Sequence, residues 1–459
     1  MRKYFGTDGI RRIANTELTP ELVYKVAKAG AYVLSKHTDH APTIFIGRDT
    51  RISGTLIESA MTAGFLSYGA NVKMLGVMPT PAVAYLTKKF KADASVVISA
   101  SHNTFEFNGV KYFSNKGMKI PDELEEEIEE VMDSRKINEL TAVNDKIGTS
   151  EIATELLDEY VYFFRKNFEE DLERLNREDF VVAVDTANGA TSVVADKVFT
   201  VLGIKHHILN DSPNGININD GCGSTHLEML KQYVIDKKCS LGIAYDGDGD
   251  RCLAVDENGN EIDGDKIIAI ISQYLKSKGK LNKDTIVATV MSNLGLNKYA
   301  KQNELNFVQT KVGDRYVLEE MLKNGYNLGG EQSGHVICLD YNPTGDGILT
   351  SLMIIRAILE QGKKASEVAS IMKAYPQVLI NAKVSSDKKY DFDKDEEIKS
   401  AIEKLNKEFD GNGRVLIRAS GTEPLVRVMI EGEDQDYIKQ KAQTIANLIE
   451  QKLGDGAKK

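Results

Sequence analysis

Cysteine is scarce in this sequence. Its 459 residues contain four cysteines, and no two of them form a CxxC pair; they are Cys222, Cys239, Cys252 and Cys338. A disulfide framework is built from recurring cysteine spacings, so this wide scatter instead predicts reduced thiols of the kind found in cytosolic proteins.

Long apolar runs and basic blocks are also missing. No apolar run is long enough to cross a bilayer, and residues 1–7 lack the apolar core of a signal peptide. The formal net charge is −10. These features disfavour nucleic acid and membrane as partners and predict a cytoplasmic location, while a local basic cluster can still bind an anionic substrate.

What the sequence does contain is a recurring series of short apolar strands separated by helices. With 42% hydrophobic and 27% charged residues, the composition is ordinary for a folded protein, and the length is too great for one core. In the first part, strands are predicted at 43–46, 72–75 and 94–98. Strands that are apolar throughout and alternate with helices are typical of a parallel sheet covered on both faces.

The same pattern recurs twice before the chain changes character. We predict three similar α/β domains with mostly parallel sheets, at residues 1–150, 151–255 and 256–372. Residues 373–459 contain adjacent strands joined by a short turn, together with two helices. This last part is predicted to be a smaller C-terminal α+β domain.

The stretch DGDGDR at 246–251 carries the strongest chemical signal. Its aspartates alternate with glycines, which add no side chain and permit tight backbone angles, so the carboxylates can converge. Convergent carboxylates repel one another unless a cation lies between them, and Mg²⁺ or Ca²⁺ prefers such oxygen ligands. Arg251 either balances this charge or grips an anion.

Two other interpretations of this stretch are open. An EF-hand calcium loop would use the aspartates and Glu257, but it requires glycine where Arg251 stands and helices where apolar strands are predicted. A solvated acidic turn is the plainer alternative. We favour a metal site at the end of the predicted strand 241–245.

Ser101 follows the predicted strand 94–98. Ligands bind beyond the carboxyl ends of strands in open parallel sheets, and His102, Asn103 and Lys111 add further polar groups here. A serine at such a place is otherwise most often a turn residue. Because neighbouring strand residues point to opposite sides, we do not expect His102 to deprotonate Ser101 directly.

Three further stretches give weaker signals. RASGTEP at 418–424 is either a phosphate cradle or an ordinary hairpin turn. EQSGH at 331–335 offers groups that can hold sugar hydroxyls, whereas the acidic run 122–132 is interpreted as a solvated helix face. The sequence thus contains a candidate metal site, a serine, a candidate phosphate-binding loop and a polar stretch that can hold sugar hydroxyls. Together these features predict phosphoryl transfer to a polar small molecule.

These motifs, in this order, resemble the α-D-phosphohexomutase superfamily. The resemblance runs from YFGTDGIR at 4–11 through SASHN at 99–103 and DGDGDR to RASGTEP, and so spans essentially the whole chain. It implies three similar α/β domains plus a smaller fourth domain around a central cleft. The GTDGIR start, SASHN and GGEQSGH resemble the bacterial branch that acts on glucosamine phosphates. The phosphoglucomutase/phosphomannomutase branch usually carries methionine where this chain has Gln332.

The resemblance also implies a reaction. Ser101 would carry a phosphoryl group, give it to glucosamine 6-phosphate and recover one from the 1,6-bisphosphate, leaving glucosamine 1-phosphate for amino-sugar nucleotide and cell-wall precursor synthesis. Glucosamine or glucose 1,6-bisphosphate would serve as primer. The implied partner is a sugar phosphate, and a homodimer is the candidate assembly, although the sequence does not give the oligomeric state.

The implied site residues form three groups. The catalytic group is Ser101, His102, Lys111 and Arg11, with Lys111 or His102 as general acid/base. The Mg²⁺ ligands are Asp246, Asp248, Asp250 and a phosphoserine oxygen of Ser101. The substrate-binding residues are Arg251, Glu331, Ser333, His335, Arg418, Ser420, Gly421, Thr422 and Arg427. A lysine in the acid/base role needs a lowered pKa, which we expect nearby cations such as Arg11 to provide.

Two departures from the superfamily pattern accompany these implications. Arg12 stands where glycine is usual, and Thr104 stands where proline usually follows SASHN. Neither removes a chemical group, so we expect them to affect loop conformation and not the reaction class. The competing hypotheses are a glucose or mannose phosphate mutase, a metal-dependent phosphatase, and a calcium-binding module without catalysis.

Overall fold

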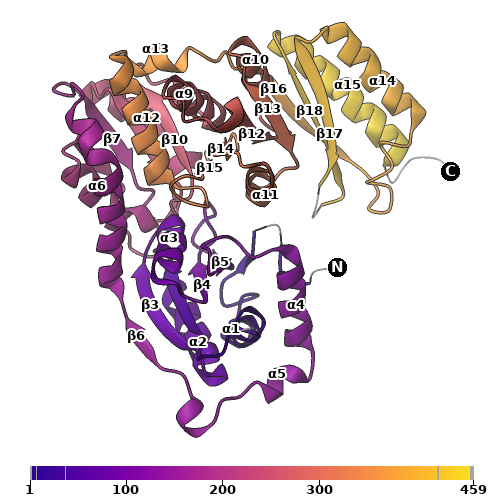
Figure 1. Ribbon diagram of the computed structural model, residues 1–459. Helices are drawn as coiled ribbons and strands as arrows, with labels where there is room; N and C mark the ends of the chain where they lie inside the picture. The colour runs from indigo at the N-terminus through magenta and orange to yellow at the C-terminus, as the bar shows by residue number, and fades with distance from the viewer. Residues whose placement is uncertain (1–2, 7, 37, 421–422, 455–459) are drawn as a thin grey trace. The chain divides into compact units, whose positions relative to one another are not determined.

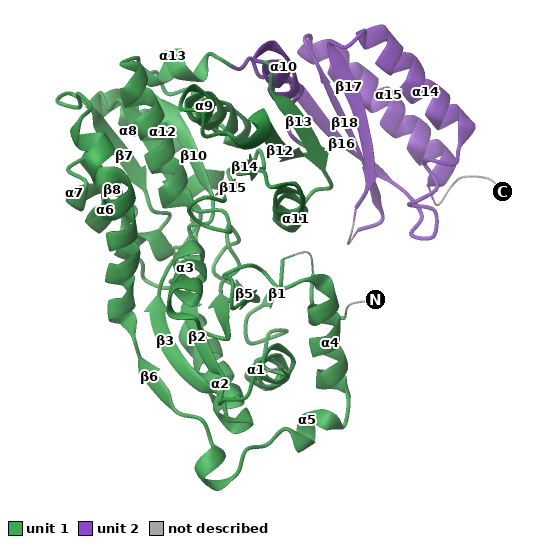
Figure 2. Cartoon of the chain, viewed as in Figure 1, with its two compact units in different colours: residues 1–291, 304–371 green, residues 292–303, 372–459 purple. Residues whose placement is uncertain are grey.

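The computed structural model describes residues 3–6, 8–36, 38–420 and 423–454. Their strands form four sheets (Figure 1). The chain divides into two compact units (Figure 2). Unit 1 comprises residues 1–291 and 304–371, and unit 2 comprises residues 292–303 and 372–459.

The first sheet of unit 1 has the strand order β1-β5-β4-β2-β3-β6. Its strands are β1 (Ile10–Ile13), β2 (Thr43–Arg48), β3 (Asn71–Val77), β4 (Ala94–Ile98), β5 (Phe107–Ser114) and β6 (Ser150–Ile152). The accompanying helices are α1 (Pro20–Leu34), α2 (Gly54–Tyr68), α3 (Thr80–Phe90), α4 (Asp122–Asp133) and α5 (Lys136–Glu139). Apolar side chains of α1 and α2 pack on this sheet in one buried core.

The second sheet has the order β11-β10-β9-β7-β8. Its strands are β7 (Val181–Asp185), β8 (Lys205–Leu209), β9 (Leu241–Tyr245), β10 (Cys252–Asp256) and β11 (Glu261–Ile262). The helices that accompany it are α6 (Leu157–Glu173), α7 (Ala195–Val201) and α8 (Glu228–Lys237).

The third sheet has the order β13-β12-β14-β15. Its strands are β12 (Thr285–Thr289), β13 (Asn306–Thr310), β14 (Leu328–Gly330) and β15 (Val336–Cys338). The helices of this part are α9 (Gly264–Ser277), α11 (Asp314–Asn324), α12 (Gly347–Gln361) and α13 (Ala365–Ala369).

In each of these sheets the strands are parallel from one edge through the middle, and the pairing at the other edge is antiparallel. In unit 2 the sheet is wholly antiparallel, in the order β16-β18-β17. Its elements are β16 (Gln377–Lys383), β17 (Gly413–Ala419), β18 (Leu425–Gly432), α10 (Leu294–Gln302), α14 (Glu396–Phe409) and α15 (Gln435–Leu453). The predicted fold class is therefore confirmed, while the predicted division at residues 150, 255 and 372 stays a prediction.

The acidic helix α4 corrects one prediction. Glu129 is buried, and its carboxylate accepts hydrogen bonds from the backbone N–H groups of Lys3, Tyr4 and Phe5 at 2.7, 2.6 and 2.7 Å. Glu125 is also buried. The run is therefore not simply a solvated face, because two of its carboxylates point inward and one holds the amino-terminal stretch.

None of the helices in the described residues has both the length and the apolar character needed to cross a bilayer. The four cysteines are free and buried.

Candidate active site

Four of the predicted motifs lie where the chain reverses direction between two neighbouring antiparallel strands. SASHN joins β4 to β5, DGDGDR joins β9 to β10, EQSGH joins β14 to β15, and RASGTEP joins β17 to β18. In unit 1 these reversals follow a strand whose carboxyl end borders the parallel part of the sheet, where ligands of such sheets bind.

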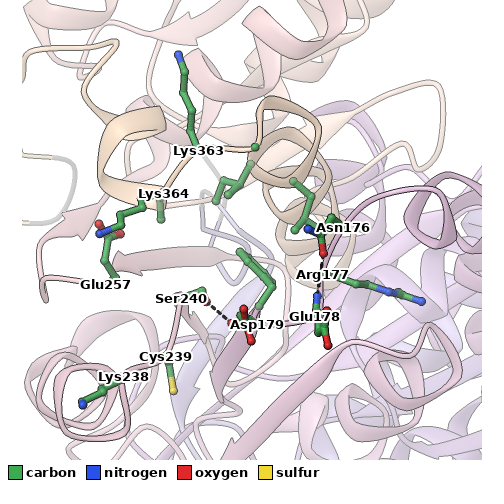
Figure 3. A pocket seen from close by; sticks show the side chains of 15 residues that line it. Asn176, Arg177, Glu178, Asp179, Lys238, Cys239, Ser240, Glu257, Lys363 and Lys364 are labelled. Atoms are coloured by element: carbon green, nitrogen blue, oxygen red, sulfur yellow. Dashed lines mark hydrogen bonds between the residues drawn. The ribbon is translucent and has the colours of Figure 1, made fainter.

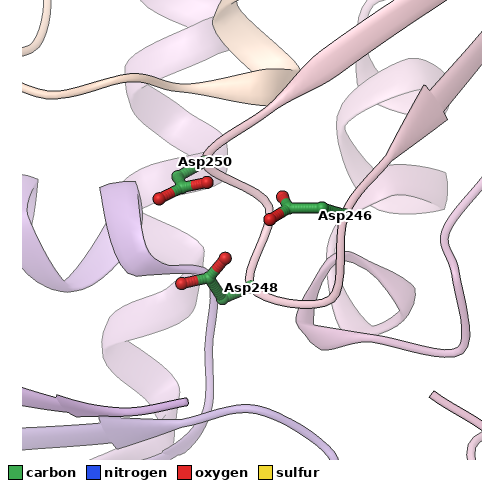
Figure 4. A group of neighbouring side chains, drawn as sticks. All are labelled: Asp246, Asp248 and Asp250. Carbon is green, nitrogen blue, oxygen red and sulfur yellow. The ribbon is translucent and has the colours of Figure 1, made fainter. Parts of the chain in front are cut away.

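The carboxylates of Asp246, Asp248 and Asp250 converge (Figure 4). Each offers one oxygen within 4.8 Å of the others, and the residues are only 0%, 0% and 6% exposed. Burial raises the pKa of Asp246, and the neighbouring charges of Asp250 and Asp248 raise it further. Within the described residues, Asp248 Oδ1 and Asp250 Oδ1 are buried without a hydrogen-bond partner. Crowded, partly unsatisfied carboxylates are the donor set that a hard divalent cation requires, so these residues fit a metal ion.

The surroundings of this cluster exclude both alternative interpretations. Strands β9 and β10 flank it and pair antiparallel, whereas an EF-hand loop lies between helices. Glu257 accepts hydrogen bonds from the N–H and Oγ of Ser366 and so has another role. The burial of all three aspartates rules out a solvated turn.

Ser101 lies against the carboxylate cluster. It is fully buried, and its Oγ donates to Asp246 Oδ2 at 2.6 Å. Its φ is 52°, in the left-handed region that costs an L-residue roughly 1 kcal/mol or more. Gly247 permits the close approach, because a Cβ there would lie 2.6 Å from Ser101 O.

His102 corrects the expectation that it points away from Ser101. Both residues follow the end of β4 and lie in a turn, where strand alternation no longer applies, and His102 Nδ1 is 3.4 Å from Ser101 Oγ. Burial lowers the pKa of His102 to about 4, and the charges of Arg251 and Arg11 contribute in the same direction. The imidazole is therefore neutral at neutral pH.

Lys111, on β5, lies among carboxylates. Its Nζ is 2.8 Å from Asp248 Oδ2, 3.2 Å from Asp8 Oδ2 and 3.6 Å from Asp250 Oδ2. Burial lowers the pKa of Lys111, but these carboxylates outweigh burial and raise it above its ordinary value. The expected lowering is therefore wrong: Arg11 acts in that direction but more weakly.

Asp8 and Thr80 were missed by the sequence reasoning. Asp8 accepts from Arg11 and Lys119 and also contacts Lys111. Thr80 donates to Asp248 twice, from its N–H to the backbone oxygen and from Oγ1 to Oδ2, both at 2.8 Å. The signal for Thr80 was its position at a helix start, but nothing local indicated its partner.

The EQSGH reversal brings His335 and Glu331 into the same surroundings. His335 Nδ1 is 3.6 Å from Asp250 Oδ2, and Nε2 accepts from Gly345 N–H at 3.0 Å. Neighbouring carboxylates outweigh burial and raise the pKa of His335, whereas the bond from Gly345 requires an unprotonated Nε2 and opposes that rise. We therefore assign the neutral ring with its proton on Nδ1, facing Asp250.

The other predicted substrate-binding residues of unit 1 are less constrained. Glu331 Oε1 accepts from Gly313 N–H at 3.0 Å, and burial raises its pKa. Ser333 is exposed. Arg251 Nε lies 3.9 Å from Asp250 Oδ1 and, among the described residues, is buried without a hydrogen-bond partner.

The two departures from the superfamily pattern have structural partners. Arg12 lies in β1 and donates from Nη2 to Lys3 O at 2.9 Å. The backbone oxygen of Thr104 accepts from Arg51.

The remaining predicted residues belong to unit 2. Arg418 and Arg427 lie directly opposite each other on β17 and β18, and burial, together with the charge of Arg427, lowers the pKa of Arg418. Ser420 is buried, and its Oγ accepts from Glu423 N–H at 3.3 Å. Gly421 and Thr422 lie outside the described residues.

A pocket of about 400 Å³ lies elsewhere in unit 1 (Figure 3). Its lining includes Asp179, just before β7, and Ser240, just before β9, so it borders the opposite ends of these strands from the carboxylate cluster. The pocket contains none of the predicted site residues. We assign the chemistry to the carboxylate cluster, because a nucleophile and unsatisfied carboxylate oxygens meet there.

The chain matches four sequence profiles of one family. They are described as phosphoglucomutase/phosphomannomutase alpha/beta/alpha domain I at residues 2–139, domain II at 158–259, domain III at 263–375 and the C-terminal domain at 379–448. Together they span most of the sequence.

Two curated relatives named phosphoglucosamine mutase are similar over their full length. The protein of Acetivibrio thermocellus is 54% identical over 456 residues, covering 99% of this chain and 100% of the relative. That of Ruminiclostridium cellulolyticum is 52% identical over 453 residues, with the same coverage of 99% and 100%.

Solved structures share the fold. A phosphoglucomutase/phosphomannomutase family protein of Burkholderia thailandensis superposes with a TM-score of 0.80 at 20% identity, covering 99% of this chain and 98% of the other. The N-acetylphosphoglucosamine mutase of Aspergillus fumigatus, solved with glucose 1,6-bisphosphate, gives 0.67 at 18% identity, covering 97% and 94%. The chain therefore belongs to the phosphoglucomutase/phosphomannomutase family of the α-D-phosphohexomutase superfamily, whose members are mutases of the isomerase class.

Proposed function

We propose that this chain is a phosphoglucosamine mutase, which interconverts glucosamine 6-phosphate and glucosamine 1-phosphate through a phosphorylated Ser101. The observation that carries the proposal is the contact of 2.6 Å between Ser101 Oγ and Asp246 Oδ2. A serine with no metal seat beside it is most often a turn residue, and an acidic cluster with no nucleophile is only a cation site. Their contact places a residue that can carry a phosphoryl group beside carboxylates that can hold a cation. The cation would neutralise the charge of the phosphoryl group.

Asp246, Asp248 and Asp250 would hold Mg²⁺, with a phosphoserine oxygen of Ser101 as a further ligand. When bound, the ion neutralises the phosphoryl oxygens as charge spreads over them in the transition state. The fit rests on the convergence of the carboxylates within 4.8 Å and on the unpaired oxygens of Asp248 and Asp250. In a distant structural neighbour, the N-acetylphosphoglucosamine mutase of Aspergillus fumigatus, magnesium accompanies a sugar phosphate.

We assign the proton transfer to His102. The neutral imidazole has Nδ1 3.4 Å from Ser101 Oγ, so it is placed to exchange a proton there. As the bond between phosphorus and Oγ breaks and the bond to the sugar oxygen forms, the sugar hydroxyl proton passes to His102 and then to Oγ. Lys111 stays an ammonium among its carboxylates, and we assign it, with Arg11, to stabilise negative charge.

Unit 2 would supply the grip on the phosphate that is not transferred. Like charges directly opposite on paired strands destabilise a sheet, so the placement of Arg418 against Arg427 favours an anion ligand. Ser420, Gly421 and Thr422 complete this proposed cradle. Arg251, Glu331, Ser333 and His335 would hold the sugar.

Replacement of Ser101 by alanine tests the phosphoryl carrier. Ser101→Ala should lower mutase activity by at least about 10³-fold in the presence of Mg²⁺ and bisphosphate primer, because the covalent route is lost. Mass spectrometry should find the phosphate increment on the wild type and not on the variant. Ser114→Ala, on β5, removes a hydroxyl that donates to Met118 O and serves as the control. Full activity of Ser101→Ala would exclude the proposal.

A separate assay tests the sugar. We expect kcat/KM to be highest for glucosamine phosphate among the glucosamine, glucose and mannose phosphates. A higher value for glucose or mannose phosphate would reassign the chain to the other branch of the family. Net release of inorganic phosphate as the main product would indicate a phosphatase.

A further inference from the structure

The backbone carbonyl groups that follow Ser101 are held by one buried guanidinium. Arg51 is 1% exposed. Its Nη2 donates to Ser101 O at 2.9 Å and to Asn103 O at 2.8 Å, and its Nη1 donates to Phe107 O at 3.1 Å and to Thr104 O. One side chain therefore fixes most of the loop between β4 and β5.

Arg51 is itself held in place by Asp49. Arg51 Nε donates to Asp49 Oδ2 at 2.8 Å, and the side chains of both residues are fully buried. Ser99 Oγ donates to the same carboxylate at 2.6 Å and accepts from Ser101 N–H at 2.9 Å. The peptide groups on both sides of Ser101 thus belong to one hydrogen-bonded chain.

A second donor reaches the same carbonyl groups from the part of unit 1 that carries the metal loop. Asn219 Nδ2 donates to Ser101 O and Asn103 O, both at 2.9 Å. Gly247 completes the enclosure, because a Cβ there would lie 2.6 Å from Ser101 O and 2.8 Å from Asn219 Nδ2. The oxygen of Ser101 is therefore enclosed by Arg51, Asn219 and Gly247.

This enclosure acts on a residue whose backbone needs support. Ser101 has φ of 52°, and a serine side chain gives no preference for that region. Rotation of the loop to negative φ would turn the Cα–Cβ bond and move Oγ away from Asp246. Donors that require the carbonyl groups in their present direction oppose that rotation.

We propose that Arg51 and Asn219 are positioning residues for phosphoryl transfer, which clamp the Ser101 and Asn103 carbonyl groups and so hold Ser101 Oγ at the cation seat. The inference rests on the proposed function. Neither residue touches the reacting atoms. Arginine suits the role because its fixed fork presents several donors at once, whereas lysine offers one mobile ammonium group.

The test uses Asn219→Gly, Asn219→Asp and Arg51→Lys in the full-length protein. Asn219 has φ of 58°, so glycine keeps its backbone conformation and removes only the amide, while aspartate keeps the shape but presents no donor. The matched control is Asn210→Gly. Asn210 also has positive φ, at 52°, but its Nδ2 donates to Asp185 Oδ1 at 2.9 Å, away from Ser101.

Four quantities separate positioning from stability. They are kcat and KM for glucosamine phosphate, the single-turnover rate at which glucose 1,6-bisphosphate phosphorylates Ser101, and the urea midpoint of unfolding. We expect the Asn219 variants and Arg51→Lys to lose about 10- to 100-fold in kcat and in the single-turnover rate, with KM changed less than about threefold. Asn210→Gly should keep both rates at a comparable urea midpoint.

Each result decides between the alternatives. Asn219 variants that keep both rates within about twofold of Asn210→Gly would overturn the inference while leaving the proposed function intact. Wild-type protein that fails to turn over any of the sugar phosphates would overturn the proposed function and the inference with it. If Arg51→Lys does not fold, the two Asn219 variants decide the outcome.

Discussion

Two sets of like charges in this molecule differ in how deeply they are buried. In unit 1, the carboxylates of Asp246, Asp248 and Asp250 crowd into a reversal between two strands and are almost inaccessible. In unit 2, the guanidinium groups of Arg418 and Arg427 lie opposite each other on paired strands and are only partly buried. Repulsion between like charges opposes folding in both arrangements, and in unit 1 the ammonium group of Lys111 offsets part of it.

Under the proposed function, the difference in burial corresponds to two kinds of ligand. Buried charges need a permanent counter-charge, since an unpaired ion in the interior is strongly disfavoured. A half-exposed pair can instead release its anion to water and bind it again. An enzyme whose bisphosphate intermediate must turn around needs both a fixed metal ion and an exchangeable phosphate grip.

The largest effect should come from removing one buried carboxylate. Asp246→Asn should lower activity by about 10²- to 10³-fold, because the metal loses a charged ligand at the nucleophile. Without metal, the free energy of unfolding of this variant should equal or exceed that of the wild type, because repulsion between like charges is relieved. Titration calorimetry with Mg²⁺ and urea unfolding would measure both.

Asp256→Asn is the matched control for that change. Asp256 lies at the far end of β10, and its Oδ1 accepts from the N–H groups of Asn258 and Asn260. This variant should keep its affinity for Mg²⁺. Its free energy of unfolding should fall by about 1–2 kcal/mol, because the hydrogen bonds that the side chain accepts in the turn are weaker. Unchanged Mg²⁺ affinity in Asp246→Asn would contradict the assignment of the metal seat.

Changes to the arginine pair of unit 2 should alter KM. Arg418→Gln should raise KM for glucosamine phosphate by about 10- to 100-fold, the worth of a charge-assisted hydrogen bond, without loss of stability. Arg414→Gln is the control in the same sheet. Arg414 donates to the buried Glu431, so its loss should destabilise unit 2 and leave KM unchanged. Equal KM changes in both variants would contradict the assignment of Arg418 to phosphate binding and of Arg414 to stability.

Removal of the metal should lower stability by a smaller, predictable amount. At a Mg²⁺ concentration of one hundred times Kd, chelation should lower the free energy of unfolding by about 2.7 kcal/mol. Thermal denaturation with and without EDTA measures this change. The change should vanish in Asp246→Asn and persist in Arg418→Gln, and a shift of equal size in both variants would argue against separate sites.

The smallest effect concerns pH and His102. Its pKa is about 4 in the folded protein, lowered by burial and by Arg251 and Arg11, against about 6.5 in the unfolded chain. As pH falls from 6.5 towards 4, the unfolded state binds a proton that the folded state does not bind, so the free energy of unfolding falls. His102→Gln should flatten the dependence of the urea midpoint on pH in this range.

Local sequence patterns predicted much of this molecule. The strand at 94–98 has the predicted bounds, and the DGDGDR and RASGTEP stretches lie in strand reversals as expected. These signals work because they depend on neighbouring residues. The wrong expectation for His102 arose because strand alternation was extended past Ile98, where the strand had ended.

Contacts between distant parts of the chain could not be predicted in this way. Thr80 and Asn219 are ordinary polar residues whose partners lie 168 and 118 positions away. Glu129 was indistinguishable from its solvated neighbours, and Arg51 gave no sign of burial. The pKa of Lys111 depends on three carboxylates from two different loops, a balance that no local pattern encodes.

The bond between Ser101 and Asp246 spans 145 positions of sequence. A growing chain would therefore have finished its first sheet long before the last residues of the metal loop exist. Because such a long-range contact closes late, the carboxylates would meet their partners only after the second sheet is complete. The proposed reaction therefore requires both halves of the site to be folded together, and an unfinished chain would be chemically inert.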